Sequence, residues 1–275
     1  MGVQGTERSR KHPSVEGVTA FQRWTRLRSP HMLEAGLWGL IAASSLVLGA
    51  TIAEARPPGR RVLGLVMAFG AGVLLSAVSF ELVEQAAKTS GQLGSTFFGL
   101  FVGAIVFTAG DLMISRLGYA ERKDLDGAPQ EAGGLTIVVG ALLDGIPESA
   151  VLGLTVLQTG DVGIALLVAV FVSNVPEAIA ATAGLRAGGW SLGRVYGLWT
   201  AIAVSSALAA AAGFVLLDGA SPDVLAFMFA FAGGAMLTMV STSMTPEAFE
   251  HAGRAAGLMT VLGFAVAFGI NWLEA

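Results

Sequence analysis

The chain has 275 residues, of which 54% are hydrophobic and 13% are charged, and its mean hydropathy is +0.70. Soluble domains carry about 25% charged residues, so this composition excludes an ordinary soluble domain and predicts a polytopic helical membrane protein. The formal charge of −4 says little, because most charged residues lie outside the apolar segments. The chain has no cysteine and three histidines. Thiolate metal sites and disulfides are therefore excluded, and a zinc enzyme or an imidazole-rich metal store is disfavoured.

Eight apolar segments are each long enough to cross the roughly 30 Å hydrocarbon core of a bilayer. We therefore predict an all-α fold with eight transmembrane helices. Their predicted bounds are 32–53, 62–86, 94–115, 133–157, 162–185, 192–217, 224–244 and 255–273. Residues 1–31 form a basic tail that we expect to be disordered, and residues 32–275 form one transmembrane domain. The tail has no apolar centre, so it does not have the pattern of a cleavable secretory signal.

The second and seventh segments share a glycine-rich motif. Residues 69–79 match residues 231–241 at a constant offset of 162 positions. An odd number of crossings separates the two segments, so they point in opposite directions across the membrane. The pattern predicts a 3+2+3 arrangement, in which an inverted repeat flanks a central hairpin of the fourth and fifth helices. Only residues 158–161 connect these two helices. Inverted repeats with interrupted helices at the midplane are typical of transporters.

The two central helices each carry a proline followed by a glutamate. The fourth helix has Asp-Gly-Ile-Pro-Glu-Ser at 144–149, and the fifth has Ser-Asn-Val-Pro-Glu-Ala at 173–178. A carboxylate inside hydrocarbon is costly, and a proline there removes a backbone hydrogen bond. A single intramembrane glutamate can be a neutral acid bonded to a neighbouring helix. Two copies in register indicate a functional site.

Helical spacing places these polar groups together, because residues four apart share a face. Asp144 and Glu148 therefore point the same way, Ser173 and Glu177 repeat the spacing, and Asn174 precedes Glu177 by three. The two prolines also leave backbone carbonyls without their usual donors. Such an oxygen-rich set suits a divalent cation, so these five residues are the predicted metal ligands. Metal binding to carboxylates displaces protons, which offers a route to proton-linked transport.

The paired Pro-Glu motifs, the 3+2+3 arrangement and the glycine-rich second helix resemble the ZIP (Zrt-, Irt-like) family of divalent-metal transporters, here as a divergent bacterial-type member. The resemblance covers about residue 33 to the C-terminus. It implies eight helices, both termini outside the cytosol, and a metal centre bridged by carboxylates of helices four and five. It also implies uptake of zinc, iron or manganese into the cytosol. Glu148 and Glu177 match the family's shared glutamates.

Three departures from the family pattern concern its ligands. Asp144 stands where the family usually has histidine, and Gly145 stands where it has a ligand asparagine. In the sixth helix the family often has Glu-Pro, whereas this chain has Thr200 and Ala201 after Gly-Leu-Trp. We therefore expect one metal position to be kept in altered form and the other to be depleted of ligands. Without imidazole, the ion preference is expected to shift from zinc toward harder ions such as Mn(II) or Fe(II).

Positive charge predicts the orientation. Four alternate loops hold nine basic residues, and the opposite loops hold only Lys88. The nine are Arg56, Arg60, Arg61, Arg116, Arg122, Lys123, Arg186, Arg194 and Arg254. The positive-inside rule places these loops in the cytoplasm and both termini outside, although the basic tail argues for the opposite orientation. We expect the protein to lie in the plasma (cytoplasmic) membrane.

The leading hypothesis is therefore a ZIP-like permease whose substrate is a divalent metal ion and which needs no organic cofactor. Its expected partners are the metal ion and the lipid bilayer, with no nucleic acid. Gly99 and Gly103 could serve a homodimer contact or packing within the chain, and we favour packing within the chain.

Three other hypotheses remain. The first is a transporter-derived protein that binds metal or protons and acts as a sensor or a non-zinc permease. The second is an enzyme, which is disfavoured because the chain has no H-E-x-x-H, G-x-S-x-G or cysteine nucleophile motif. The third is a purely structural membrane protein, which would leave the paired motifs unexplained.

Overall fold

The computed structural model describes residues 30–116 and 135–274. Within these ranges the chain is helical and contains no β-strand, which confirms the all-α class. The predicted N-terminal tail lies outside the described residues except for its last two positions, where the first described helix begins. Arg122 and Lys123, which entered the prediction of orientation, also lie outside the described residues.

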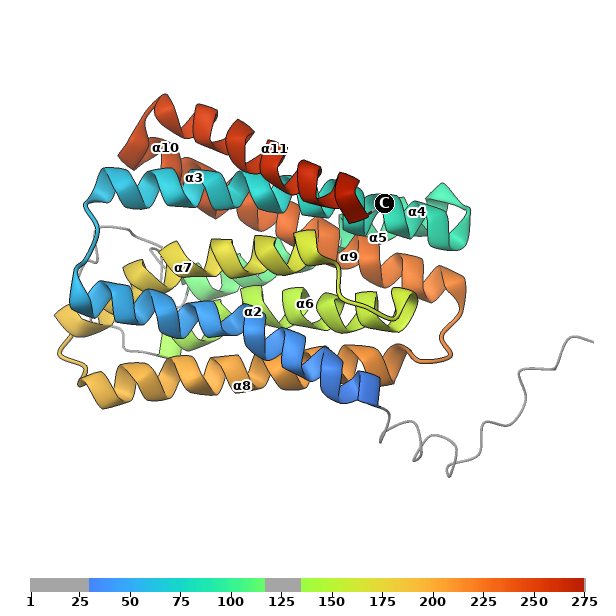
Figure 1. Ribbon diagram of the computed structural model, residues 1–275, viewed down its shortest axis with the longest axis horizontal. Helices are drawn as coiled ribbons and strands as arrows, with labels where there is room; N and C mark the ends of the chain where they lie inside the picture. Colours follow the sequence, from blue (N-terminus) through green and yellow to red (C-terminus); the bar gives the residue numbers. More distant parts are fainter. Residues whose placement is uncertain (1–29, 117–134, 275) are drawn as a thin grey trace, which may run out of the picture.

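Among the described residues, eight helices are long and apolar enough to cross a membrane, as the sequence predicted. In Figure 1 the long helices run roughly along one common direction, as expected for helices that cross one bilayer. Two π-helical segments, η1 and η2, each join two α-helices without a break. The elements are α2 (Pro30–Ala55), α3 (Arg60–Ala77), η1 (Val78–Val83), α4 (Glu84–Ser90), α5 (Leu93–Arg116), α6 (Leu135–Thr159), α7 (Ile164–Ala187), α8 (Leu192–Leu217), α9 (Pro222–Met239), η2 (Val240–Met244), α10 (Thr245–Ala252) and α11 (Ala255–Glu274).

The second and seventh membrane helices are longer than the apolar segments that predicted them. The second membrane helix continues from Arg60 to Ser90, and the seventh continues from Pro222 to Ala252. The predicted apolar segments end near the points where polar residues begin. Glutamate, glutamine and alanine favour a helix, so the backbone stays helical after the apolar residues end.

The π-helical segments occupy equivalent positions of the sequence repeat. η1 begins at Val78 and η2 at Val240, which is the 162-residue offset found between the two glycine-rich motifs. π-helical turns are rare, and they occur frequently at functional sites. The two copies therefore share an uncommon backbone feature as well as a sequence motif.

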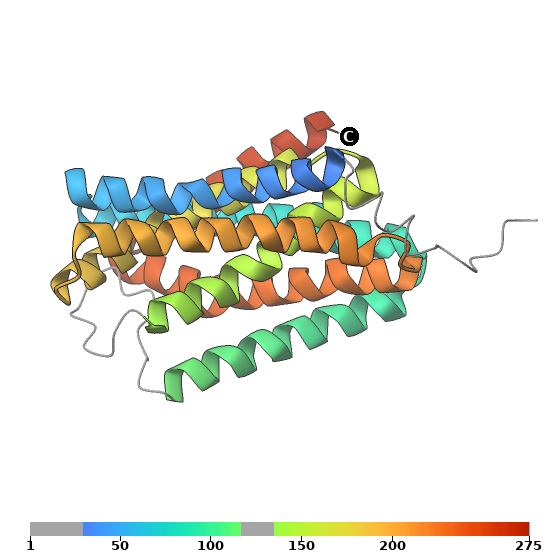
Figure 2. The same ribbon diagram turned by 90° about the horizontal axis from the view of Figure 1, so that it is seen from below.

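Three helix pairs pack with almost no space between their backbones. α3 runs along α11 (Figure 1), α5 runs along α9 (Figure 2), and α6 runs along α8. At six glycines, a Cβ atom would overlap a backbone carbonyl oxygen of the partner helix. These contacts join Gly72 to Thr260, Gly263 to Phe69, Gly103 to Phe231, Gly234 to Leu100, Gly153 to Ala210 and Gly213 to Ala150. Gly99 also faces α9, so the predicted small-residue pair Gly99 and Gly103 serves packing within the chain.

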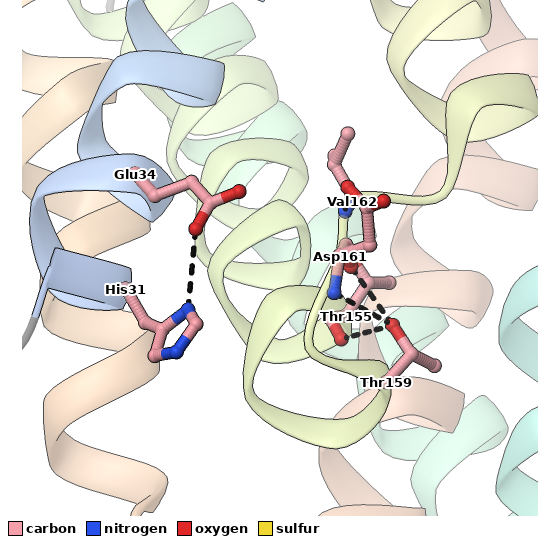
Figure 3. A network of polar contacts seen from close by, with 6 residues as sticks. All are labelled: His31, Glu34, Thr155, Thr159, Asp161 and Val162. Carbon is pink, nitrogen blue, oxygen red and sulfur yellow. Dashed lines mark hydrogen bonds and ion pairs between the residues drawn. The ribbon is translucent and has the colours of Figure 1, made fainter.

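A tight turn joins α6 to α7, as the four-residue connection predicted. Figure 3 shows the Thr159 hydroxyl within hydrogen-bond distance of the Thr155 and Asp161 carbonyl oxygens, at 2.9 and 2.8 Å. The Val162 N–H donates to the Asp161 carboxylate at 2.8 Å. Gly160 adopts a φ of +81°, which glycine accepts without strain. The same view includes the contact of His31 with Glu34 in the first turn of α2.

Beyond this turn the two helices diverge. α6 packs mainly along α8, whereas α7 packs along α2 and α3, and α6 and α7 touch each other little. The sequence predicted a tight hairpin, and only its connection is tight. Because each helix finds its main partner elsewhere, the space between them is not filled by direct packing.

Candidate functional site

A cavity lies in this space. Within the described part of the chain, it is lined by residues from α2, α6, α7 and α8, and by none from α3, α5, α9 or α11. The volume of the cavity is about 40 Å³. One water molecule needs roughly 10–15 Å³ of such space, so the cavity has room for a cation with part of its hydration shell.

Four of the five predicted ligands line this cavity. Asp144 and Glu148 come from α6, and Asn174 and Glu177 come from α7. Glu148 is 1% exposed and Asp144 is 6% exposed, so their side chains are held inside the protein. The helical spacing of each pair, four on α6 and three on α7, turns both pairs toward the gap between the helices.

The prolines lie inside helices that continue through them. Pro147 is within α6 and Pro176 is within α7. A proline has no N–H, so the carbonyl oxygens of Leu143 and Val172 receive no hydrogen bond from it. Each proline thus adds a backbone acceptor five residues before a glutamate. Both helices stay whole because their other backbone bonds and their packing on neighbouring helices hold them.

Ser173 is the predicted ligand that does not line the cavity. It is buried, and its hydroxyl donates to the Val170 carbonyl oxygen at 3.0 Å. Its backbone faces α3, where a Cβ atom on Gly70 would lie 3.2 Å from the Ser173 Cα. The close approach of α3 at this glycine turns Ser173 away from α6.

The wall from α8 carries no acid among the described lining residues. Trp199 and Ser206 line the cavity from this helix, and Ser149 lines it from α6. Thr200 and Ala201, where the family pattern has Glu-Pro, are exposed on the outer side of α8. These three lining residues were not among the ligands predicted from the sequence. The seven-residue spacing of Trp199 and Ser206, which places them on one face two turns apart, was the available signal.

The charge of the lining is wholly acidic. Over the described ranges it contains Asp144, Glu148 and Glu177 and no lysine, arginine or histidine. The three carboxyl groups are not isolated, since each has an interaction partner within the protein. Among residues 30–116 and 135–274, no group of three or more His, Asp or Glu side chains is arranged so that it could hold a metal ion as it stands. A cation here would need neutral oxygens, water or a small rearrangement to complete its coordination.

The fold and the cavity together define an integral membrane protein, whose described residues form eight apolar helices with acidic and amide side chains gathered in the interior. No protein-family model matches the chain. An Arabidopsis thaliana protein named "putative zinc transporter" is 29% identical over 193 residues, which cover 69% of this chain. The match covers 30% of that relative, so this chain corresponds to less than a third of the relative's length.

Proposed function

We propose that this protein is a ZIP-like transporter that moves a divalent metal cation across the membrane. Asp144, Glu148, Asn174 and Glu177 are the ligands. The observation that carries the proposal is the cavity between α6 and α7, which gathers these side chains inside an otherwise apolar bundle. Burial of carboxylates in such a bundle is costly, and a bound cation offsets that cost. The similarity to the plant protein supports a metal ion as the substrate.

The finer parts of the proposal concern the ion, the direction and the membrane. The described lining offers carboxylate and amide oxygens and no imidazole or thiolate, which favours Mn(II) or Fe(II) beside Zn(II). The basic loops on one side favour an orientation with both termini outside the cytosol. Uptake into the cytosol across the plasma membrane is what the resemblance to the ZIP family implies. Transport of a cation accounts for the buried carboxylates, so no enzymatic role is needed to explain them.

Metal flux into proteoliposomes tests the proposal, with Zn(II), Mn(II), Fe(II) and Cd(II) compared. The native protein is expected to move at least one ion, and the Glu148→Ala/Glu177→Ala variant is expected to move none. A double variant that transports as well as the native protein would exclude these residues as ligands. Glu84→Ala is the control, because Glu84 is an exposed residue that pairs with Lys88 outside the cavity.

A second candidate function is metal binding without transport, as in a sensor. The neutral wall of α8 and the glycine at 145 favour it, because the first lacks a carboxylate ligand and the second lacks an amide ligand. Native protein that binds a cation in solution but moves none in proteoliposomes would select this candidate.

A further inference from the structure

One side chain in the cavity lining is much larger than the others. Trp199 is the only aromatic residue among the described lining residues and is 2% exposed. The facing residues of α6 and α2 include Gly140, Ala141, Gly145 and Ala43, which occupy little volume. The position of the indole ring therefore decides how much space the carboxylates share with a cation.

The ring of Trp199 is fixed in place from two sides. Its indole N–H donates to the Thr182 hydroxyl at 2.9 Å, and Thr182 is fully buried on α7. The ring also packs in an apolar cluster that includes Leu46, Ala178 and Ile202. Rotation of the ring away from the cavity would break a buried hydrogen bond and this packing.

This bond also links the two helices that carry the walls. Thr182 lies five residues after Glu177 on α7, so the anchor of the indole and a carboxylate of the cavity share one helix. The bond therefore ties the ring on α8 to the helix that carries Glu177. The size of the cavity is thus set by a built contact rather than by loose packing.

We propose that Trp199, positioned by Thr182, sets the size limit of the cation cavity and thereby determines which divalent cations it accepts. This inference rests on the proposed function, because it assumes that the cavity takes a cation. Mg²⁺ and Ca²⁺ both prefer oxygen ligands, at roughly 2.0–2.1 Å and 2.3–2.6 Å respectively. A larger cavity should favour the larger ion. The indole wall then acts on size, whereas the carboxylates act on charge.

Competition with bound Mn²⁺ tests the size limit in the full-length purified chain. The free Mn²⁺ signal in electron paramagnetic resonance reports binding, and Mg²⁺ and Ca²⁺ are the competitors. Trp199→Ala is expected to raise the ratio of Ca²⁺ to Mg²⁺ affinity at least about threefold, and Trp199→Phe by less. Thr182→Val loses the hydroxyl that accepts the indole hydrogen bond, so it should also raise the affinity ratio. Thr182→Ser keeps a hydroxyl, so its affinity ratio should equal the native value.

Trp38 supplies the matched control. It lies on α2 outside the cavity lining, and its indole nitrogen is buried without a hydrogen-bond partner among the described residues. Trp38→Ala is therefore expected to leave the affinity ratio at its native value. An unchanged ratio in Trp199→Ala, or an equal rise in Trp38→Ala, would overturn the inference. If Trp199→Ala does not fold, the Thr182→Val and Thr182→Ser pair decides the question.

The same measurement separates this inference from the proposed function. Native protein that binds Mn²⁺ but moves no ion in proteoliposomes contradicts transport and leaves the size limit testable by the affinity ratio. Native protein that binds no divalent cation overturns both.

Discussion

The close helix pairs α3–α11, α5–α9 and α6–α8 differ from the cavity wall in what their small residues do. In the pairs, glycines such as Gly72, Gly234 and Gly153 lie against a backbone carbonyl oxygen, so no space remains between the helices at these points. At the cavity, a Cβ atom on Gly145 would meet nothing closer than the Ser206 hydroxyl, at 3.6 Å, within the described part of the chain. A glycine opposite a backbone brings two helices together, whereas a glycine in the cavity wall leaves room.

The same contrast applies to polar groups. The close pairs are held by backbone contacts between small residues, which is how helices associate where lipid provides no hydrophobic driving force. The cavity contains three acids, whose burial costs free energy that the surrounding helices must offset. We therefore expect changes in the pairs to affect stability and changes in the cavity to affect binding. Each of the following experiments tests this division.

The largest expected effect is on cation binding. Glu148→Gln removes one buried charge and keeps the shape of the side chain, because Glu148 is almost fully buried in the cavity lining. Affinity for Mn²⁺ should fall at least about 100-fold, or roughly 2.8 kcal/mol. Calorimetric titration measures the change, with Glu84→Gln as a control outside the cavity. The thermal unfolding temperature should not fall, and native affinity in the variant would remove Glu148 from the ligand set.

The second effect is on stability. Gly263→Ala on α11 would place a Cβ atom against the Phe69 carbonyl oxygen. The helices must then separate, at a cost of about 1–3 kcal/mol. Gly269 lies on the same helix with no described atom within 4 Å of its would-be Cβ, so Gly269→Ala is the matched control. Thermal unfolding in detergent should show a lower midpoint for Gly263→Ala alone. Equal midpoints in the two variants would contradict the close-packing argument.

Hydropathy predicted the helices well, because lipid requires about 20 apolar residues from each crossing helix. The costly carboxylates also predicted a metal site on α6 and α7, and four of its five predicted ligands line the cavity. The rotation of each residue about its helix was harder to predict. Ser173 shares the helical spacing of Asp144, yet the approach of α3 at Gly70 turns it away from the cavity.

Trp199 shows another limit of sequence reasoning. A tryptophan in an apolar helix has the same pattern whether it faces lipid, a neighbouring helix or a cavity. Its role depends on the distance between α7 and α8, which no local pattern encodes. The turn between α6 and α7 shows a related limit. Its length predicted a tight connection, but it did not predict that the two helices diverge beyond the turn.

A third experiment tests the space at the cavity by filling it. Gly145→Asn adds an amide oxygen at a position where the nearest atom to a Cβ is the Ser206 hydroxyl. Affinity for Mn²⁺ should rise about three- to tenfold, or roughly 0.7–1.4 kcal/mol. Gly197→Asn, on the open side of α8, adds the same group away from the cavity and should leave affinity unchanged. A loss of affinity in Gly145→Asn would show that the cavity has no room for another ligand.

The smallest expected effect lies at the surface, where the cavity helices meet the aqueous side. The Arg186 guanidinium pairs with the Glu54 carboxylate at 2.8 Å and joins the end of α7 to the end of α2. The two side chains are 40% and 24% exposed, so water and salt screen their attraction. Glu54→Gln should cost no more than about 1 kcal/mol of stability. The loss should shrink further in high salt, and Mn²⁺ affinity should stay native. If Glu54→Gln weakened binding as Glu148→Gln does, the cavity would depend on this distant pair, and the division between binding and stability would fail.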